Sequence, residues 1–491
     1  MYNRLTAGGS TEAQAVQSGV WVTAINVGDR LLQLLKVIIL ARLLSPEAFG
    51  LLGIALVTIA ALRRFSNLGF DEALIQREEE NVDAYLNTAW VIKIIRGAVI
   101  AIIAFLAAPS LATFFGEPQA EPLIQLLGFT PLILGVQNPA VMYFRKHLNF
   151  HREFVYQVGG RLMDLLVAVT IALEFRSVWA LPAGIVAMNL VKAVLSYGIH
   201  DYRPSIEFDL NLGREMFGFG KWMFVSSILV FIYGQGDDAF VGWFFTATGL
   251  GYYQLAYRFS NAPATEITHV ISRVAFPTFS KVQDDTEKLR AGFFSTVQLS
   301  TVIAFPMAAG IAAVSRPFVH IFLGAQWSPM VPLLQILCVW GGLRALGANI
   351  GPVFKSLGRP DIETWTQAIQ VLVTALIIIP VSERFGIVGV ALSVIAGSIT
   401  ILIPQLYLVL SMVKGDARRL TLITIYPLFA STLMFLVVLL VNDTLLVSYS
   451  IFNLVGLVVV GVVSYCIVIG TVEMWTNYSV APLLRRVAAS I

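Results

Sequence analysis

Residues 386–411 read GIVGVALSVIAGSITILIPQLYLVLS and contain no charged side chain. An α-helix rises about 1.5 Å per residue, so a run of this length can cross the roughly 30 Å hydrocarbon core of a bilayer. Similar apolar runs recur along the whole chain, of which 57% is hydrophobic and 13% is charged. Soluble domains average about a quarter charged residues. The sequence therefore predicts an integral membrane protein.

About fourteen membrane spans are predicted, all of them helices because a backbone in lipid must satisfy its own hydrogen bonds. They cover residues 18–41, 48–66, 85–108, 122–143, 154–173, 178–199, 214–234, 238–258, 292–314, 330–354, 364–382, 386–411, 420–441 and 450–472. When the loops alternate between the two sides, Lys and Arg divide roughly five to one. The poorer side holds only Arg42, Arg176, Arg316 and Arg384. Cytoplasmic loops are rich in positive charge, so both termini are predicted to be cytoplasmic.

The chain also resembles a duplicated sequence. LLSPEAFGLL from Leu43 aligns with FFTATGLGYY from Phe244, and Pro122 aligns with Pro332. Each half would hold six spans, which predicts an all-α fold of two parallel six-helix lobes around a central cavity. The lobes would be residues 1–205 and 206–413, and residues 414–491 would add two helices and a cytoplasmic tail. The alternative is that apolar helices align by chance.

Motifs of enzymes are absent from the sequence: there is no GxxxxGK[ST] loop and no HExxH. The predicted outward loops are short, the longest being about 109–121 and 315–329, which leaves little room for an outward catalytic site. Cys338 and Cys466 lie in apolar runs, where cysteine behaves as a small hydrophobe. We therefore predict no catalytic residue, no metal or other cofactor, and no nucleic-acid partner.

Charged and polar side chains inside the spans are the candidate functional residues, because charge in a membrane is costly and usually faces a partner or a wet cavity. They recur at three- and four-residue steps, which places them on single helix faces. The candidate substrate-binding cations are Arg30, Lys36, Lys93, Arg96, Arg161, Lys192 and Arg344. The supporting polar and acidic residues are Asn26, Asp29, Gln33, Gln157, Asp164, Asn189, Gln367 and Gln370.

The balance of these charges predicts what the cavity binds. Seven cations facing lipid would cost roughly 20 kcal/mol in total. Only Asp29 and Asp164 are placed to neutralise them, and Asp164 has the spacing to pair with Arg161 on one helix. A surplus of about five positive charges predicts a hydrated cavity for a phosphate or pyrophosphate. Alternatively, single cations are structural or reach the interface, and Arg161 with Asp164 is the best candidate for a purely structural pair.

Two acidic residues, Asp237 and Asp238, are predicted to begin the span 238–258. Negative charge stabilises a helix N-terminus, so their expected role is capping.

Several stretches resemble the polysaccharide transporter family, the Wzx-type flippases of the multidrug/oligosaccharidyl-lipid/polysaccharide superfamily. They are LARLLSPEAFGLLGIALV from Leu40, LGFDEALIQRE ending at Glu78, LGYYQLAYRFSNAP from Leu250, RVAFPTFSKVQ from Arg273, FVHIFLGAQW from Phe318 and SLGRPD from Ser356. The resemblance implies two six-helix lobes whose central cavity opens alternately to each side. It also implies a prokaryotic plasma or inner membrane. It does not assign individual cavity residues.

The first functional hypothesis is therefore a flippase for a glycan carried on a polyprenyl or dolichyl (pyro)phosphate, with membrane lipid around it. Glycosyltransferases or a polymerase or ligase of the same pathway are candidate partners. A cation or drug antiporter of the same superfamily is the alternative, and it would need acidic cavity residues such as Asp29. A membrane enzyme that polymerises or ligates glycans is a third hypothesis, which the short outward loops disfavour.

Overall fold

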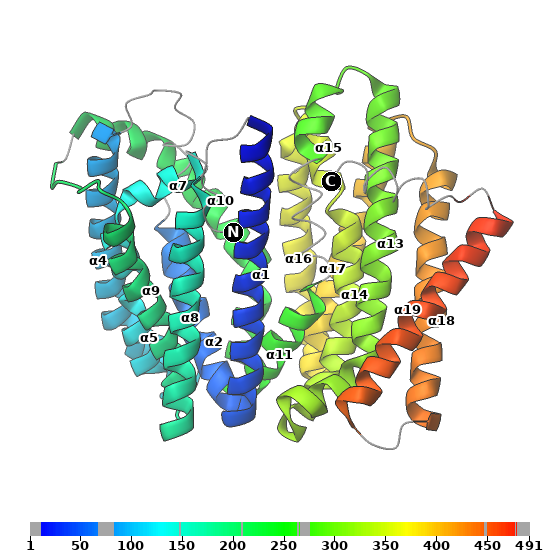
Figure 1. Ribbon diagram of the computed structural model, residues 1–491, viewed down its shortest axis with the longest axis horizontal. Coiled ribbons are helices and arrows are strands. Elements are labelled where there is room, and N and C mark those ends of the chain that lie inside the picture. Colours follow the sequence, from blue (N-terminus) through cyan, green and yellow to red (C-terminus); the bar gives the residue numbers. More distant parts are fainter. Residues whose placement is uncertain are drawn as a thin grey trace. The chain divides into compact units, whose positions relative to one another are not determined.

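The structure, a computed structural model, describes residues 11–66, 83–146, 149–207, 210–262, 265, 275–445, 449–476 and 478. Leu68 to Glu78, which carry one of the family-like stretches, lie outside the described residues. The chain divides into two compact units, Met1–Gly251 and Tyr252–Ile491. Helices joined by turns and short loops make up the described part of both units, which contains no strand (Figure 1). The predicted all-helical fold is confirmed.

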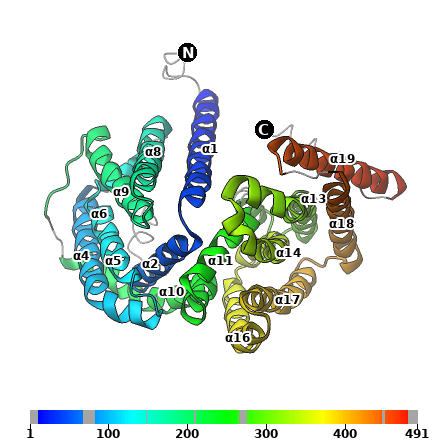
Figure 2. The ribbon, with the colours of Figure 1, turned by 90° about the horizontal axis from the view of Figure 1, so that it is seen from below.

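Unit 1 is a set of long helices linked by short turns. Its elements are α1 (Thr11–Leu43), α2 (Pro46–Phe65), α4 (Asp83–Phe114), α5 (Ala120–Gly128), α6 (Thr130–Val136), the 3-10 turn η2 (Pro139–Met142), α7 (Tyr143–Lys146), α8 (Phe150–Phe175), α9 (Ala180–Ile199), α10 (Leu210–Phe244) and the first turn of α11 (Ala247–Ser260). Within it α1 packs along α8, α8 along α9, and α4 against α5 and α6 (Figure 2).

Unit 2 begins within α11 and is also a set of helices linked by short connections. Its elements are α13 (Thr286–Phe318), the π-helical turn η3 (Val319–Leu323), the 3-10 turn η4 (Ala325–Met330), α14 (Val331–Gly347), α15 (Ile350–Ser356), α16 (Pro360–Phe385), α17 (Ile387–Met412), α18 (Ala417–Leu445) and α19 (Ile451–Trp475). Helices α16 and α17 pack together, α14 packs on α13 and α17, and α18 and α19 pack on α13.

Local sequence signals set the helix boundaries. Ser45 precedes Pro46 and its Oγ accepts a hydrogen bond from the backbone N–H of Ala48, which caps α2. Asp285 caps α13 in the same way by accepting from the N–H of Lys288. Gly386 separates α16 from α17 with a φ of 62°, a conformation that glycine adopts without steric cost. These residues divide the apolar chain into separate helices.

Nine helices among the described residues are long and apolar enough to cross a membrane. Three more, α1, α8 and α10, exceed about 18 residues but carry charges within their apolar sequence. Large apolar side chains are exposed on α4, α9, α16, α17 and α19, as expected of surfaces that face acyl chains. Examples are Leu106, Val194, Leu376, Tyr407 and Phe452. The count of fourteen spans stays a prediction.

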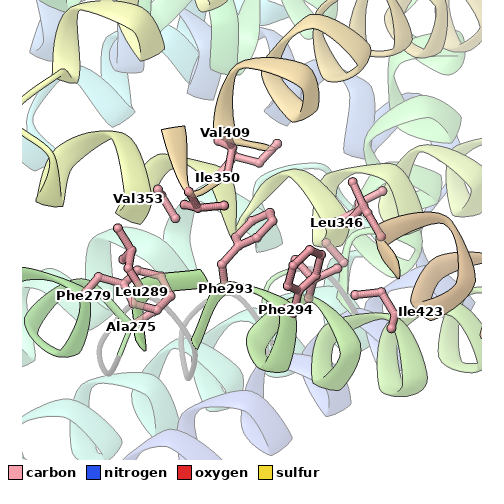
Figure 3. Packing of buried hydrophobic residues seen from close by; sticks show 14 of the residues in the cluster. Ala275, Phe279, Leu289, Phe293, Phe294, Leu346, Ile350, Val353, Val409 and Ile423 are labelled. Atoms are coloured by element: carbon pink, nitrogen blue, oxygen red, sulfur yellow. The ribbon is translucent and has the colours of Figure 1, made fainter. Parts of the chain in front are cut away.

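The interior of unit 2 is an apolar cluster centred on α13. Phe293 and Phe294 are buried and lie beside Ile350 of α15, Val409 of α17 and Ile423 of α18 (Figure 3). Burying a large apolar side chain stabilises a fold by about 1.5–3 kcal/mol in water, and dense packing adds the dispersion contacts that matter in lipid. This cluster fixes the helices of unit 2 to one another.

The predicted boundary between two of the spans is wrong. Spans 214–234 and 238–258 were expected to be separated near residues 235–237, whereas α10 runs through to Phe244. Asp237 and Asp238 therefore lie inside a helix and do not cap one. The break follows at residues 245–246, before α11 begins at Ala247. When the two halves are aligned, this break coincides with the break between α1 and α2.

Candidate functional site

A cluster of charged side chains joins α1 to α8 inside unit 1. Asp29 and Lys36 lie seven residues apart on α1, which is two helical turns, so both can face the same neighbour. Arg161 and Asp164 lie one turn apart on α8 and face them. The periodicity of the polar stripe on α1 thus places two of its members against α8.

Arg161 is the centre of this cluster. Its Nε lies 2.7 Å from Oδ1 of Asp29 and its Nη2 lies 3.4 Å from Oδ2 of the same carboxylate. Its Nη1 lies 3.3 Å from Oδ2 of Asp164, which confirms the pairing predicted from their spacing on one helix. The guanidinium therefore donates to two carboxylates at once, in the two-pronged geometry that arginine favours.

Lys36 completes the network by forming an ion pair with Asp164. The side chain of Asp164 is 1% exposed, and it has room because Gly184 of α9 carries no side chain. A Cβ at Gly184 would lie 2.5 Å from Oδ1 of Asp164. The pair is buried and hydrogen-bonded, the arrangement in which charges survive away from water.

Lys192 of α9 lies next to this network. Its Nζ donates a 2.7 Å hydrogen bond to Oε1 of Gln157 and lies 5.4 Å from the centre of the Tyr156 ring. Its stem crosses Gly160, where a Cβ would approach Lys192 Cγ to 2.7 Å. The Tyr156 hydroxyl donates to Oε1 of Gln137 at 2.7 Å. Lys192 therefore brings a third cation to the face of α8 that carries Arg161.

We call Asp29, Lys36, Arg161, Asp164 and Lys192 the charge cluster. It holds three cations and two carboxylates, so it has one positive charge in excess. Tyr156 and Gln137 were missed by the sequence reasoning, because neither is charged and their contact joins two different predicted spans. Only the position of Tyr156 beside Gln157 could have pointed to it.

The other candidates of unit 1 lie around or away from the cluster. Arg30 and Asn26 have exposed side chains on α1, and Gln33 is half-buried there. Asn189 is buried and donates to the carbonyl of Ile185 in its own helix. These positions place Arg30 and Gln33 near the charge cluster along α1 and give Asn189 a local role.

The two candidates of α4 are both half-buried, and Lys93 precedes Arg96 by one helical turn. Arg96 contacts the end of α2, where its Nη2 donates to the carbonyl of Arg63 at 2.6 Å and its Nε to Ser66 Oγ at 3.0 Å. Arg96 thus caps the carbonyl end of α2, a favourable place for a cation.

Unit 2 holds a second, smaller polar group around α14. The Arg344 guanidinium lies 5.1 Å from the Trp340 ring centre and donates to Oδ1 of Asn261 at 3.0 Å. Trp340 Nε1 donates to Ser398 Oγ at 3.1 Å, and Gln370 Nε2 reaches the same oxygen at 2.9 Å. The structure thus connects Arg344 to Gln370 through two residues that sequence reasoning missed. The tryptophan one turn before Arg344 was the available signal.

Gln367, the remaining candidate, is half-buried on α16 one turn before Gln370. Among the residues that the structure describes, no three His, Cys, Asp or Glu side chains gather in a way that could hold a metal ion.

The chain is similar in sequence to several known proteins. WzxC of Escherichia coli, a lipopolysaccharide biosynthesis protein, is 28% identical over 448 residues, which are 90% of this chain and 88% of WzxC. ExoT of Rhizobium meliloti, a succinoglycan biosynthesis transport protein, is 28% identical over 357 residues, 72% of each chain. These matches confirm the resemblance to the polysaccharide transporter family.

A solved structure shares the fold. The lipid II flippase MurJ in an inward closed conformation matches with a TM-score of 0.72 over 91% of this chain and 97% of MurJ, at 14% sequence identity. At that identity the likeness establishes the fold alone. A family model described as polysaccharide biosynthesis protein matches residues 39–332, more than half of the sequence. The chain belongs to the polysaccharide biosynthesis protein family.

Proposed function

We propose that the chain is a flippase, which moves a glycan linked to a polyprenyl or dolichyl (pyro)phosphate from the cytoplasmic to the outer face of the membrane. The charge cluster is the observation that carries the proposal, because it places three cations against two carboxylates in helices that are predicted to span the membrane. A site with surplus positive charge attracts phosphate oxygens, and arginine binds them with two parallel hydrogen bonds.

The relatives support this proposal. WzxC and ExoT are named for surface polysaccharide biosynthesis, ExoT for transport, and MurJ is named as a flippase of lipid II. Transport by alternating access would use residues 1–205 and 206–413 as the two lobes, with 414–491 as the added helices and tail. Both termini would be cytoplasmic, and the glycosyltransferases, polymerase or ligase of the same pathway would be its partners.

An enzymatic role is less well supported. Helices α4 and α5 are joined by the five residues between Phe114 and Ala120, and the turns η3 and η4 fill most of the connection between α13 and α14. A catalytic site needs a nucleophile or acid–base pair on such outward segments. These connections are short and offer no space for a domain.

A cation antiporter is the second candidate, and the position of Asp237 and Asp238 inside α10 favours it. Carboxylates in a membrane helix are the groups that bind cations or protons in such transporters. Asp29 and Asp164 are paired with cations of the protein, which weakens their attraction for a further cation. Resistance to cationic drugs on expression, without a glycan phenotype, would favour the antiporter.

The proposal is tested with purified protein in liposomes that contain a fluorescent polyprenyl-pyrophosphate oligosaccharide. The fraction of label that a membrane-impermeant quencher can reach reports its movement between leaflets. We expect movement well above that of protein-free liposomes, and equal rates would contradict the proposal. Arg384→Gln, a cation removed from the exposed last turn of α16, is the matched control and should keep the wild-type rate.

A further inference from the structure

The two carboxylates of the charge cluster differ in accessibility. The side chain of Asp164 is 1% exposed, whereas that of Asp29 is 31% exposed. Asp164 is also enclosed by Lys36, by Arg161 and by the backbone of α9 at Gly184. An anion that enters the cluster can therefore replace Asp29 much more readily than Asp164.

The Asp29 carboxylate binds the Arg161 guanidinium in the geometry that a phosphate would use. Its two oxygens lie 2.7 Å from Nε and 3.4 Å from Nη2, so one edge of the guanidinium faces both oxygens of one group. Two oxygens of a phosphate make the same pair of contacts with an arginine. The Asp29 carboxylate thus fills the place that an anionic ligand of Arg161 would take.

A second cation is available to that ligand. Lys192 of α9 donates to Gln157 of α8, which lies one helical turn from Arg161 on the same helix, so the two cations lie beside the same face of α8. The partner of Lys192 in this contact is a neutral amide rather than a carboxylate. A (pyro)phosphate at Arg161 would gain from the charge of Lys192 without having to break an ion pair at this contact.

We propose that Asp29 is an internal competitor of the substrate: the (pyro)phosphate of the lipid-linked glycan displaces its carboxylate from Arg161 and binds Arg161 together with Lys192. This inference rests on the proposed function. The ion pair of Lys36 with Asp164 stays intact and keeps α1 beside α8 during the exchange. Displacement of Asp29 raises the net charge of the remaining cluster from one to two positive charges, which favours the bound anion.

The exchange links substrate binding to α1. The anion binds only when Asp29 has left Arg161, so it stabilises arrangements of α1 in which the turn around Asp29 has moved. Asp29 and the anchoring residue Lys36 are two turns apart, which lets the first turn move while the second stays in place. Asp29 thereby excludes weak anions and couples binding of the substrate headgroup to a change in α1.

The test measures binding of undecaprenyl pyrophosphate to the purified full-length protein in detergent. Asp29→Asn keeps the shape of the side chain and removes its charge, so the competitor is lost. We expect the dissociation constant for undecaprenyl pyrophosphate to fall by about tenfold, because the variant has no carboxylate at position 29 that competes for Arg161. Asp361→Asn is the matched control, since Asp361 pairs with Arg359 at the exposed start of α16, and its affinity should equal that of the wild type.

Two further variants make the outcome decisive. Asp29→Ser should also tighten binding, and it replaces Asp29→Asn if that variant does not fold. In Asp29→Asn with Arg161→Gln the gain should disappear, because the site of competition has been removed. Unchanged or weaker binding in both folded Asp29 variants would overturn the inference.

Failure of this inference and failure of the proposed function give different results. If the wild type moves the labelled glycan but the Asp29 variants bind pyrophosphate lipid no more tightly, only the inference fails. If the Asp29 variants bind more tightly but the wild type moves no glycan, the anion site stands and the flippase proposal fails.

Discussion

At the scale of the residue, the cost of burying charge is met by pairing. Asp164 accepts from Lys36 of α1 and from Arg161 of its own helix, and its side chain is almost fully buried. Removal of one partner from a buried ion pair is strongly unfavourable because it leaves an uncompensated charge. Asp29 makes a more exposed pair with the same arginine, which makes it the weaker anchor.

The first prediction concerns this anchor. Asp164→Asn should destabilise the protein by about 3 kcal/mol, because Lys36 and Arg161 lose a buried counter-charge. Denaturant unfolding in mixed micelles measures the difference. Asp29→Asn is the comparison and should cost less than about 1 kcal/mol. Equal losses of stability in the two variants would show that the difference in burial does not make the contacts of Asp164 more stabilising than those of Asp29.

The sequence predicted part of this network and missed the rest for a physical reason. Arg161 and Asp164 are three residues apart on a helix, so their contact follows from helical geometry. The contacts of Lys36 with Asp164 and of Asp29 with Arg161 join residues 128 and 132 positions apart, and helix packing decides them. The sequence predicted a surplus of about five positive charges. The charge cluster contains only three of the seven candidate cations, and its surplus is one positive charge.

At the scale of the element, two prolines inside helices each leave a carbonyl group that a neighbouring helix contacts. Pro306 lies inside α13 and cannot donate to the carbonyl of Val302, one turn earlier. The buried hydroxyl of Tyr465 on α19 donates to that oxygen at 2.9 Å. Helix α19 is therefore attached to α13 by a specific polar contact in addition to apolar packing.

A second carbonyl freed by a proline is contacted by a neighbouring helix at α18. Pro427 leaves the carbonyl of Ile423 without its helical donor, and the hydroxyl of Thr301 on α13 lies 3.0 Å from it. The same hydroxyl also lies within 3.1 Å of two carbonyls of its own helix. Neighbouring residues of α13 thus take part in both contacts. These hydroxyls offer a polar contact to carbonyls that would have no water partner in lipid.

The second prediction is a coupling between Tyr465 and Pro306. Tyr465→Phe should cost about 1 kcal/mol of stability, because the carbonyl of Val302 loses its donor. In the background of Pro306→Ala the same change should cost much less, since an alanine has the backbone N–H that supplies the helical hydrogen bond. A double-mutant cycle measured by thermal unfolding gives the coupling, and Tyr407→Phe, at an exposed position, is the control. Additive losses would contradict the account.

A third prediction concerns the crossing of α2 with the first turn of α11. A Cβ at Gly50 would lie 1.6 Å from the carbonyl oxygen of Ala247, and one at Gly251 would lie 2.1 Å from that of Pro46. Gly50→Ala should therefore cost at least about 2 kcal/mol, because backbone must move. Gly456→Ala, with nothing within 4 Å, should be neutral or stabilising. Thermal unfolding compares them, and equal stability of both variants would refute the close crossing.

The continuous helix α10 shows where sequence reasoning fails at this scale. Gly234, Gly236 and the pair Asp237–Asp238 resemble a turn, and in water such residues often end a helix. The helix continues through them, as is favoured in lipid, where the backbone has no alternative hydrogen-bond partner. The environment overrides the local propensity, and the chain breaks only at residues 245–246, at the register of the first break.

At the scale of the whole molecule, hydropathy and motif order were sufficient to predict an all-helical membrane protein of the right family. The reason is that spans are set by bilayer thickness and backbone hydrogen bonding, both of which composition reveals. The number of spans and the positions of the lobes depend on charged helices such as α1 and α8, which resemble soluble helices by composition. Charge in these helices is also the basis of the proposed function.

The central claim is that Arg161 binds the anionic headgroup of a lipid-linked glycan during its transport. The most direct measurement is the initial rate at which Arg161→Gln moves a fluorescent polyprenyl-pyrophosphate oligosaccharide across liposomes, relative to the wild type at equal protein density. We predict a loss of at least about tenfold, with Arg384→Gln unchanged, because a bidentate charged contact is removed. A folded Arg161→Gln protein that transports at the wild-type rate would contradict the account.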